Sequence, residues 1–353
     1  MAGQELEALL VSRPENRRYL SGYEAEDAGL TESAGHLLIS ADKALVLTDF
    51  RYEEEAAEEA AGFEVKVYKE GLDKLLAGLV KDLGISRLGF EADYLTYSAV
   101  RKLVKALDKV KMVPTTELVS GLRVIKEPHE VQAIEVSLAL IEEVMDRLIA
   151  DLKPGQTERQ AAWRIVTGLK EKGAEPAFET IVASGPNGAK PHAVPTERTM
   201  GQGEAIVIDA GARLKGYCSD ITRTVCLGRP SRKFKEVYQT VRQAQLAAIE
   251  GLRPGMTSAQ ADSLAREVIL RAGYGQNFGH SLGHGVGLAP HEAPSLSPLR
   301  EDPLEPGMVH TIEPGIYLPG WGGVRLEVMA LVTETGCRVL GALDRFYSFQ
   351  DGA

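Results

Sequence analysis

The sequence predicts a two-domain α/β protein, and three observations support this prediction. The chain has 353 residues, more than one ordinary compact core accommodates, so two domains are expected. Its first part, up to about residue 120, alternates strand-like apolar runs with helical patterns, as α/β domains do. The second part contains an internal repeat: the segment that begins at Leu152 resembles the one that begins at Leu252, 100 residues later.

The N-terminal elements follow from hydropathy patterns. Apolar runs at 35–40 and 43–50 are expected to form paired strands, with further strands at 63–69 and 87–91. Helices are expected at 52–61 and 72–84. Pro128 precedes a long amphipathic pattern, which indicates a helix start and a domain boundary just before it. We therefore expect domains at 1–122 and 123–353.

Composition excludes several classes of protein. Hydrophobic residues make up 44% of the chain and charged residues 25%, as in soluble globular proteins. A net charge of −10 without a Lys/Arg cluster argues against nucleic acid and anionic membrane surfaces. No stretch reaches the ~20 apolar residues of a membrane span, and the first ten residues lack a signal-peptide core. The three cysteines lack CxxC spacing, which favours a reducing compartment, and we expect a cytoplasmic protein.

The internal repeat predicts pseudo-symmetry in the second domain. LKPGQTERQAA (152–162) matches LRPGMTSAQAD (252–262), and T-x-x-Q in both copies is a capping-box signature at a helix start. Equivalent residues continue at the same offset in three pairs: Gly173 and Gly273, Phe178 and Phe278, Gly185 and Gly285. We therefore expect one pseudo-symmetric α/β domain with its site between the two halves.

Two aspartates flank a predicted hairpin. AIVIDA (205–210) and SDITRTV (219–225) are β-type runs, with the turn formers Lys215 and Gly216 between them. Asp209 and Asp220 are equidistant from the Leu214–Lys215 bond, which predicts a cross-strand pair with Cβ atoms ~5 Å apart. Such carboxylates repel each other, and a bound cation would relieve the repulsion. The alternative is two turn-flanking aspartates in solvent.

A second predicted hairpin carries two glutamates. Glu313 and Glu327 are equidistant from Gly320 within MVHTIEPGIYLPGWGGVRLEVMALV, so they too are expected to face each other. Arg325 should share the strand face of Glu327. A salt bridge to Glu327 and a role in substrate binding are equally compatible with its position.

Three histidines crowd into HSLGHGVGLAPHE (280–292), which is either a surface turn or part of a metal or catalytic site. Four carboxylates with one histidine form a hard, oxygen-rich ligand set that suits two Mn²⁺, Co²⁺, Fe²⁺ or Zn²⁺ ions better than one tetrahedral zinc. Paired ions ~3.5–4 Å apart activate water and stabilise a tetrahedral intermediate. That is the chemistry of amide, ester or phosphate hydrolysis.

These motifs resemble those of the pita-bread metallopeptidases, peptidase family M24, which includes methionine aminopeptidase, aminopeptidase P and prolidase. VIDAG, YCSDITRT, HSLGHGVGL..HE, TIEPGIY and GVRLE occur in the family's order, and IVASGPNGAKPHAVPTER (181–198) resembles its substrate-loop segment. SRPENRRYLSGY (12–23) resembles the start of the creatinase/prolidase-type N-terminal domain, which methionine aminopeptidase lacks. The resemblance implies a creatinase-like α/β domain followed by a pseudo-symmetric pita-bread catalytic domain.

The resemblance also implies roles for individual residues. It implies two divalent metal ions, most readily Mn²⁺ or Co²⁺, held by Asp209, Asp220, His284, Glu313 and Glu327. His291 and His192 would bind the substrate and stabilise the developing oxyanion, and Glu313 would transfer the proton. Tyr317 and Arg325 would act beside the metal ligands, Arg325 also in substrate binding, and His280 would lie by the proline pocket.

Some histidines have simpler explanations. His280 is equally compatible with packing beside Phe278, and His192 with an ordinary loop position. His36, His129 and His310 belong to no constellation, and His310 stands where relatives usually carry an apolar or hydroxyl side chain.

The implied function is cleavage of Xaa-Pro bonds at peptide N-termini, as in an Xaa-Pro aminopeptidase acting on peptides with proline in second position. The alternative is an Xaa-Pro dipeptidase (prolidase), and Ser295 weighs against it because some prolidases carry an arginine there; Arg300 is a nearby substitute. A hydrolase of non-peptide amides and a non-catalytic binding protein on the same fold rank lower. The resemblance also implies a homodimer.

Overall fold

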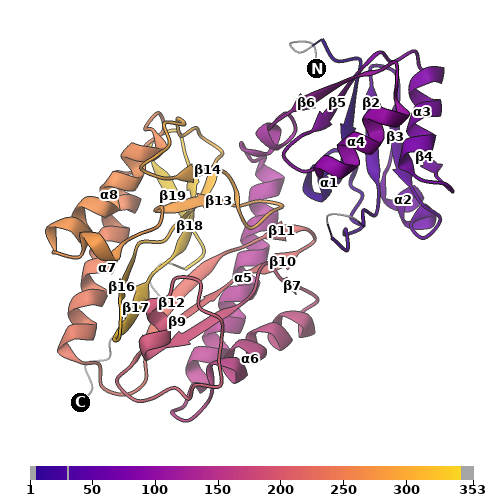
Figure 1. Ribbon diagram of the computed structural model, residues 1–353. Coiled ribbons are helices and arrows are strands. Elements are labelled where there is room, and N and C mark those ends of the chain that lie inside the picture. The colour runs from indigo at the N-terminus through magenta and orange to yellow at the C-terminus, as the bar shows by residue number, and fades with distance from the viewer. Residues whose placement is uncertain (1–4, 30–31, 343–353) are drawn as a thin grey trace. The chain divides into compact units, whose positions relative to one another are not determined.

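The computed structural model describes residues 5–29 and 32–342, and the chain divides after Arg123 into two compact units. Both units mix helices and strands (Figure 1). Among the described residues, no helix is long and apolar enough to cross a membrane.

The first unit is a six-stranded mixed sheet in the order β4-β3-β2-β1-β5-β6. The predicted pairing of the second and third strands is confirmed, since β2 and β3 run antiparallel. Its strands are β1 (Ala8–Val11), β2 (His36–Ser40), β3 (Ala44–Thr48), β4 (Glu64–Val67), β5 (Arg87–Glu91) and β6 (Lys111–Thr115). Its helices are α1 (Pro14–Ser21), α2 (Glu53–Glu59), α3 (Leu72–Asp82), α4 (Tyr97–Ala106) and the 3₁₀ helix η2 (Ser120–Arg123).

Both faces of this sheet are buried. Leu10 and Leu38 pack with Leu76 of α3 in one core cluster, whereas their neighbours Leu9 and Leu37 belong to the other. Successive strand residues point to opposite faces, so nearly continuous apolar runs are what a sheet covered on both sides requires.

The second unit places its strands between two helix pairs (Figure 1). The helices are α5 (Pro128–Asp151), α6 (Glu158–Glu171), α7 (Arg232–Gly251) and α8 (Ser258–Arg271), with 3₁₀ helices η3 (Gly185–Ala189) and η4 (Gly275–Asn277). The first half has β7 (Glu175–Pro176), β8 (Ile181–Ser184), β9 (Ala205–Ala210), β10 (Ala212–Leu214), β11 (Tyr217–Cys218) and β12 (Ile221–Cys226). The second half has β13 (Gly283–Gly285), β14 (Glu292–Leu296), β15 (Val309–Ile312), β16 (Gly315–Leu318), β17 (Gly322–Arg325), β18 (Val328–Val332) and β19 (Cys337–Leu340).

Strand order in the second unit follows the two halves. The main sheets are β12-β9-β8 and β14-β13-β15-β18-β19, with smaller sheets β11-β10-β7 and β16-β17. One apolar cluster is built largely on α5 and α6 and a second on α7 and α8. Each half therefore has its own helix pair, and the cluster on α5 and α6 also takes in second-half residues such as Val309 and Met329.

The predicted repeat is confirmed at the helix starts. Thr157 caps α6 and Thr257 caps α8 with the same reciprocal capping box. The preceding turns also match, because Gly155 donates its amide hydrogen to Met200 and Gly255 donates its own to Leu304.

The offset continues to the end of the following strand, because Gly185 and Gly285 both lie at a strand's C-terminal end. Gly185 directly follows β8 and opens η3, whereas Gly285 is the last residue of β13. Beyond these glycines the halves differ, since η3 follows β8 and strand β14 follows β13.

The predicted direct pairing of Asp209 with Asp220 is also wrong. Asp209 lies opposite Thr222, because the turn is centred one residue later than expected, between Lys215 and Gly216. Both turn residues have positive φ, 46° and 79°, the backbone of a two-residue hairpin turn that matches strand twist. Asp209 and Asp220 are therefore diagonal neighbours on one face of the hairpin.

Candidate metal centre

All five predicted metal ligands converge in the second unit. Their ligand atoms form overlapping groups, each within 4.8 Å: Asp220, His284 and His291; His284, Glu313 and Glu327; Asp209, Asp220 and Glu327. Glu313 and Glu327 lie opposite each other as predicted, since the pairs flanking them, Ile312 with Val328 and Gly315 with Arg325, keep one register.

The carboxylates of this cluster are buried and would repel one another if all were ionised. Burial, reinforced by Glu327 and Asp209, raises the pKa of Asp220 well above its ordinary value. Burial likewise raises the pKa of Glu327, with Glu313 adding to the shift, and raises the pKa of Glu313 to about 8. Bringing several buried carboxylates together is unfavourable unless a positive charge compensates them.

The hydrogen bonding of Asp209 indicates what that charge is. Its Oδ2 accepts from Arg325, but its Oδ1 is buried without a hydrogen-bond partner among the described residues. An orphaned oxygen on a carboxylate grouped with two others, Asp220 and Glu327, is the arrangement a divalent cation satisfies. The residues therefore fit divalent metal.

His284 is in the protonation state that a metal ligand needs. Its Nδ1 lies 3.1 Å from the carbonyl oxygen of Gly285, and burial lowers its pKa to about 4. A neutral ring donating from Nδ1 leaves Nε2 as a lone-pair donor. This Nε2 faces the cluster, 3.3 Å from Glu313 Oε1 and 3.6 Å from Asp220 Oδ2.

Glycine allows His284 to reach this position. A Cβ atom built on Gly283 would lie 2.0 Å from the backbone oxygen of Thr311, far inside contact distance. Strand β13 therefore runs against β15 at a separation that only glycine permits.

Arg325 does not form the salt bridge to Glu327 that its place in the strand suggested. Its Nη2 pairs with Asp209 Oδ2 at 2.5 Å, and its Nη1 donates to Tyr317 Oη at 2.7 Å. Glu327 instead accepts from the Thr222 hydroxyl at 2.7 Å, and that hydroxyl accepts from Arg325 Nε. The packing of β17 against β9 determines that Arg325 pairs with Asp209. The residue pattern of a single strand does not reveal such a contact between strands.

Tyr317 connects Arg325 to His280. The Tyr317 hydroxyl lies 2.9 Å from His280 Nε2, and His280 Nδ1 lies 2.8 Å from the carbonyl of Ser281. Burial lowers the pKa of His280 to about 4, so the neutral ring donates from Nδ1 and accepts from Tyr317. His280 also packs edge-on against Phe278, with ring centroids 5.0 Å apart, so both expected roles are compatible with its position.

His291 and His192 lie exposed at the edge of the cluster. The His291 ring is 4.2 Å from that of His284 between centroids. His192 follows Pro191, whose carbonyl oxygen accepts from Arg325 Nη1 at 3.2 Å. Burial lowers the pKa of His280 and of His291, and the charge of His192 adds to both shifts. His291 in turn adds to the effect of burial on the pKa of His284.

Two threonines of the site escaped the sequence interpretation. Thr222 binds Glu327, and Thr311 donates to Glu313 and accepts the amide hydrogen of His284. Strand alternation contained the signal, because each threonine lies two residues from a ligand, Asp220 or Glu313, and shares its face. His310, to which no role was assigned, is fully buried, and burial lowers its pKa to about 3.

A pseudo-symmetric domain with four carboxylates and a neutral histidine at the centre defines a metal-dependent hydrolase. The chain belongs to metallopeptidase family M24, whose model matches residues 132–334. Residues 1–125 match the creatinase/prolidase N-terminal domain.

Similar proteins span almost the whole chain. The peptidase YqhT of Bacillus subtilis is 40% identical over 336 residues, 95% of this chain and 93% of that protein. An Xaa-Pro dipeptidase from Bacillus anthracis has a similar structure, with a TM-score of 0.91 and 39% identity, covering 96% of this chain and 94% of that one. An X-Pro aminopeptidase from Thermotoga maritima superposes with a TM-score of 0.88 at 36% identity, covering 96% of each chain.

Proposed function

We propose that the protein hydrolyses the peptide bond before a second-position proline, using two divalent metal ions, Mn²⁺ or Co²⁺. The observation that carries this proposal is the complete ligand set with an unpartnered Asp209 oxygen among buried carboxylates. Asp209, Asp220, His284, Glu313 and Glu327 would hold the metal. When bound, such ions polarise a carbonyl and favour deprotonation of water.

The chain's own residues supply the remaining chemistry. A carboxylate oxygen of Glu313 accepts the proton that leaves the attacking water and passes it to the departing proline nitrogen. His291 and His192, exposed beside the cluster, bind the peptide and stabilise the negative charge that develops on the carbonyl oxygen. Arg325 holds Asp209 and Tyr317 in position, contacts the substrate-facing loop at Pro191, and takes part in substrate binding.

Between the two Xaa-Pro activities, we propose removal of the first residue from longer peptides. A dipeptidase needs a cation for the free carboxylate of its substrate, and Ser295 donates to the Gly283 carbonyl at the position where some prolidases carry arginine. Arg300, the nearby substitute, is half-exposed and lies 3.6 Å from Asp302.

Dipeptidase activity is the second candidate. The similar structure from Bacillus anthracis carries the name Xaa-Pro dipeptidase, and the one from Thermotoga maritima carries the name X-Pro aminopeptidase, at comparable identity.

The test compares turnover of matched Xaa-Pro and Xaa-Pro-Yaa peptides with Mn²⁺ present. Release of the first residue from the tripeptide at the higher kcat/KM supports the aminopeptidase. Preference for the dipeptide establishes the dipeptidase instead, and no turnover of either peptide contradicts both.

We further propose a cytoplasmic homodimer. The three cysteines are free thiols, as in proteins of reducing compartments, and the dimer follows from the family resemblance. Light scattering of the purified protein tests the oligomeric state, and a monomeric mass would contradict it.

A further inference from the structure

Glu158 is a fully buried carboxylate outside the metal centre, at the first position of α6. It accepts five hydrogen bonds, all within 3.0 Å, and every donor belongs to the chain on either side of His192. The donors are Ser184 N and Oγ to Oε1, and Asn187 Nδ2, Thr196 N and Thr196 Oγ1 to Oε2. One side chain therefore joins the two ends of the segment 184–196, which we term the His192 loop.

Burial of this charge is compensated locally. Glu158 lies at the positive N-terminal end of α6, where a carboxylate is favourable. The Arg198 guanidinium also interacts with this charge: the hydrogen bond to Glu204 is the main cause that raises the pKa of Arg198, and Glu158 adds to it. Arg198 also donates to Ser184 Oγ at 2.6 Å, so that hydroxyl is directed toward Glu158.

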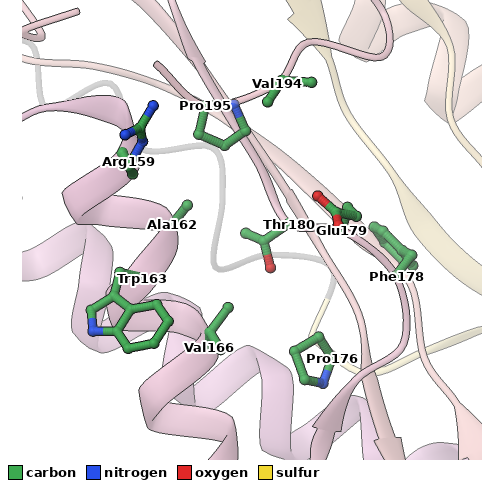
Figure 2. Close-up of a pocket in the computed structure, with 10 residues that line it drawn as sticks. All are labelled: Arg159, Ala162, Trp163, Val166, Pro176, Phe178, Glu179, Thr180, Val194 and Pro195. Carbon is green, nitrogen blue, oxygen red and sulfur yellow. The ribbon is translucent and has the colours of Figure 1, made fainter. Parts of the chain in front are cut away.

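Other contacts also hold the His192 loop, among them the hydrogen bond from Asn187 Nδ2 to the Val194 carbonyl at 3.3 Å. Arg325 binds it at Pro191, and η3 packs against β17 so closely that a Cβ on Gly323 would lie 2.1 Å from Gly188 O. On its other side the loop contacts the start of α6, where the Arg159 amide donates to the Thr196 carbonyl at 3.1 Å. Val194 and Pro195 border a cavity of about 490 Å³. Figure 2 shows Trp163 of α6 among the residues across it.

The second half of the domain lacks this arrangement. The residue equivalent to Glu158 in the repeat is Ser258, and within the part of the chain that the structure describes its hydroxyl donates only to the carbonyl of Asp302, at 3.3 Å. Capping of the helix therefore does not require a carboxylate here. Glu158, which accepts five hydrogen bonds, occurs in the half whose loop carries His192.

We propose that Glu158 is a positioning residue that holds the His192 loop in the geometry required for substrate binding and catalysis. Its action runs through hydrogen bonds to the loop ends, and it touches neither substrate nor metal. The proposal rests on the proposed function, because it takes His192 as a group that contacts the peptide.

Glu158→Gln tests the proposal with minimal change of shape. A glutamine amide has one acceptor oxygen and one donor nitrogen. In either orientation the glutamine nitrogen faces a backbone N–H, that of Ser184 or that of Thr196. Two donors then face each other, so one end of the loop loses its hydrogen bond to residue 158. Glu197→Gln is the matched control, since Glu197 directly follows the loop and, among the described residues, its side chain forms an exposed ion pair with Arg159 and no other.

Activity is measured on an Xaa-Pro-Yaa peptide with the Mn²⁺-loaded full chain. We expect Glu158→Gln to lower kcat/KM about 10- to 100-fold, with the same division between kcat and KM as His192→Ala, and Glu197→Gln to change it less than 2-fold. In the His192→Ala background, Glu158→Gln should have little further effect, because both substitutions remove one interaction. Additive losses would overturn the proposal.

Hydrogen exchange separates this proposal from the peptidase proposal, because it needs no turnover. We expect Glu158→Gln to exchange amide hydrogens faster within residues 184–196 only, and to bind Mn²⁺ as the wild type does. Unchanged exchange in the loop overturns the proposal even if the wild type is active. Thr196→Val removes one donor and retains the carboxylate, so it gives the same loop-confined change at smaller amplitude if Glu158→Gln does not fold. Without any loop-confined change in Thr196→Val, the proposal is equally overturned.

Discussion

Arg325 Nη2 lies 2.5 Å from Asp209 Oδ2 and joins β17 to β9 across 116 residues of sequence. This ion pair occupies one oxygen of Asp209, and the other has no hydrogen-bond partner among the described residues. The same guanidinium binds Tyr317, Thr222 and the Pro191 carbonyl. Arg325 therefore connects the proposed metal ligand Asp209, the His280 side of the site and the His192 loop.

Arg325→Lys should impair turnover more than metal binding. Lysine retains the charge but cannot form the planar fork that binds several acceptors. We expect kcat/KM to fall about 30- to 100-fold, corresponding to ~2–3 kcal/mol, while plasma emission still detects metal. Arg338→Lys, in an exposed ion pair with Glu135, is the control. Equal losses in both variants would show that Arg325 has no special role.

Tyr317→Phe should uncouple His280 from Arg325. The substitution removes only the hydroxyl that receives the Arg325 hydrogen bond and contacts His280. Losing it should lower kcat/KM roughly 10-fold, or about 1–1.5 kcal/mol. Tyr274→Phe removes a hydroxyl bound to Glu236 away from the cluster and should be silent. Full activity of Tyr317→Phe would contradict the role we give to this contact.

Asp220→Asn should stabilise the metal-free protein but reduce the stability that the protein gains from Mn²⁺. In chelated protein it removes one of several repelling buried carboxylates, so Tm should rise by about 2–4 °C per kcal/mol relieved. With Mn²⁺ present the variant should gain less stability than the wild type and recover no activity. Calorimetry with and without chelator measures both effects. A chelated variant less stable than the chelated wild type would argue against repulsion in this cluster.

His36 should make the first unit less stable as pH falls. Burial, aided by Arg17 and opposed by Asp27, lowers its pKa from 6.5 to about 4, and its Nδ1 lies 2.9 Å from Ser12 Oγ. Between pH 6.5 and 4 the unfolded chain binds a proton that the folded unit excludes. Stability is therefore present above pH 6.5 and is lost progressively toward pH 4, by up to about 3 kcal/mol.

His36→Gln isolates this contribution, since glutamine does not titrate. Urea unfolding of both proteins at pH 7 and pH 4.5 should show a smaller loss in the variant. An identical loss in both would mean that His36 protonates freely in the folded unit.

Local patterns predicted much of this molecule. Capping boxes at Thr157 and Thr257, the β2–β3 pair and the facing glutamates all follow from short-range periodicity and turn chemistry. The convergence of four carboxylates with His284 followed from hairpin geometry together with the family's motifs.

Features set by long-range packing were not predictable in this way. The partner of Arg325 depends on how β17 crosses β9, and the five donors to Glu158 come from a loop that no periodicity describes. The error in pairing Asp209 with Asp220 was a one-residue shift of a turn, which moves every cross-strand partner by two positions. Lys215 and Gly216 were recognised as turn formers, but only their positive φ values determine the centre.

The central claim is that this site is a metal-dependent peptidase centre acting at proline. Its most direct test is the rate of first-residue release from an Xaa-Pro-Yaa peptide, measured before chelation, after exhaustive chelation and after Mn²⁺ is restored. We predict that activity is lost on chelation and returns with Mn²⁺ in the wild type but not in Asp220→Ala. Turnover unaffected by exhaustive chelation would contradict the claim.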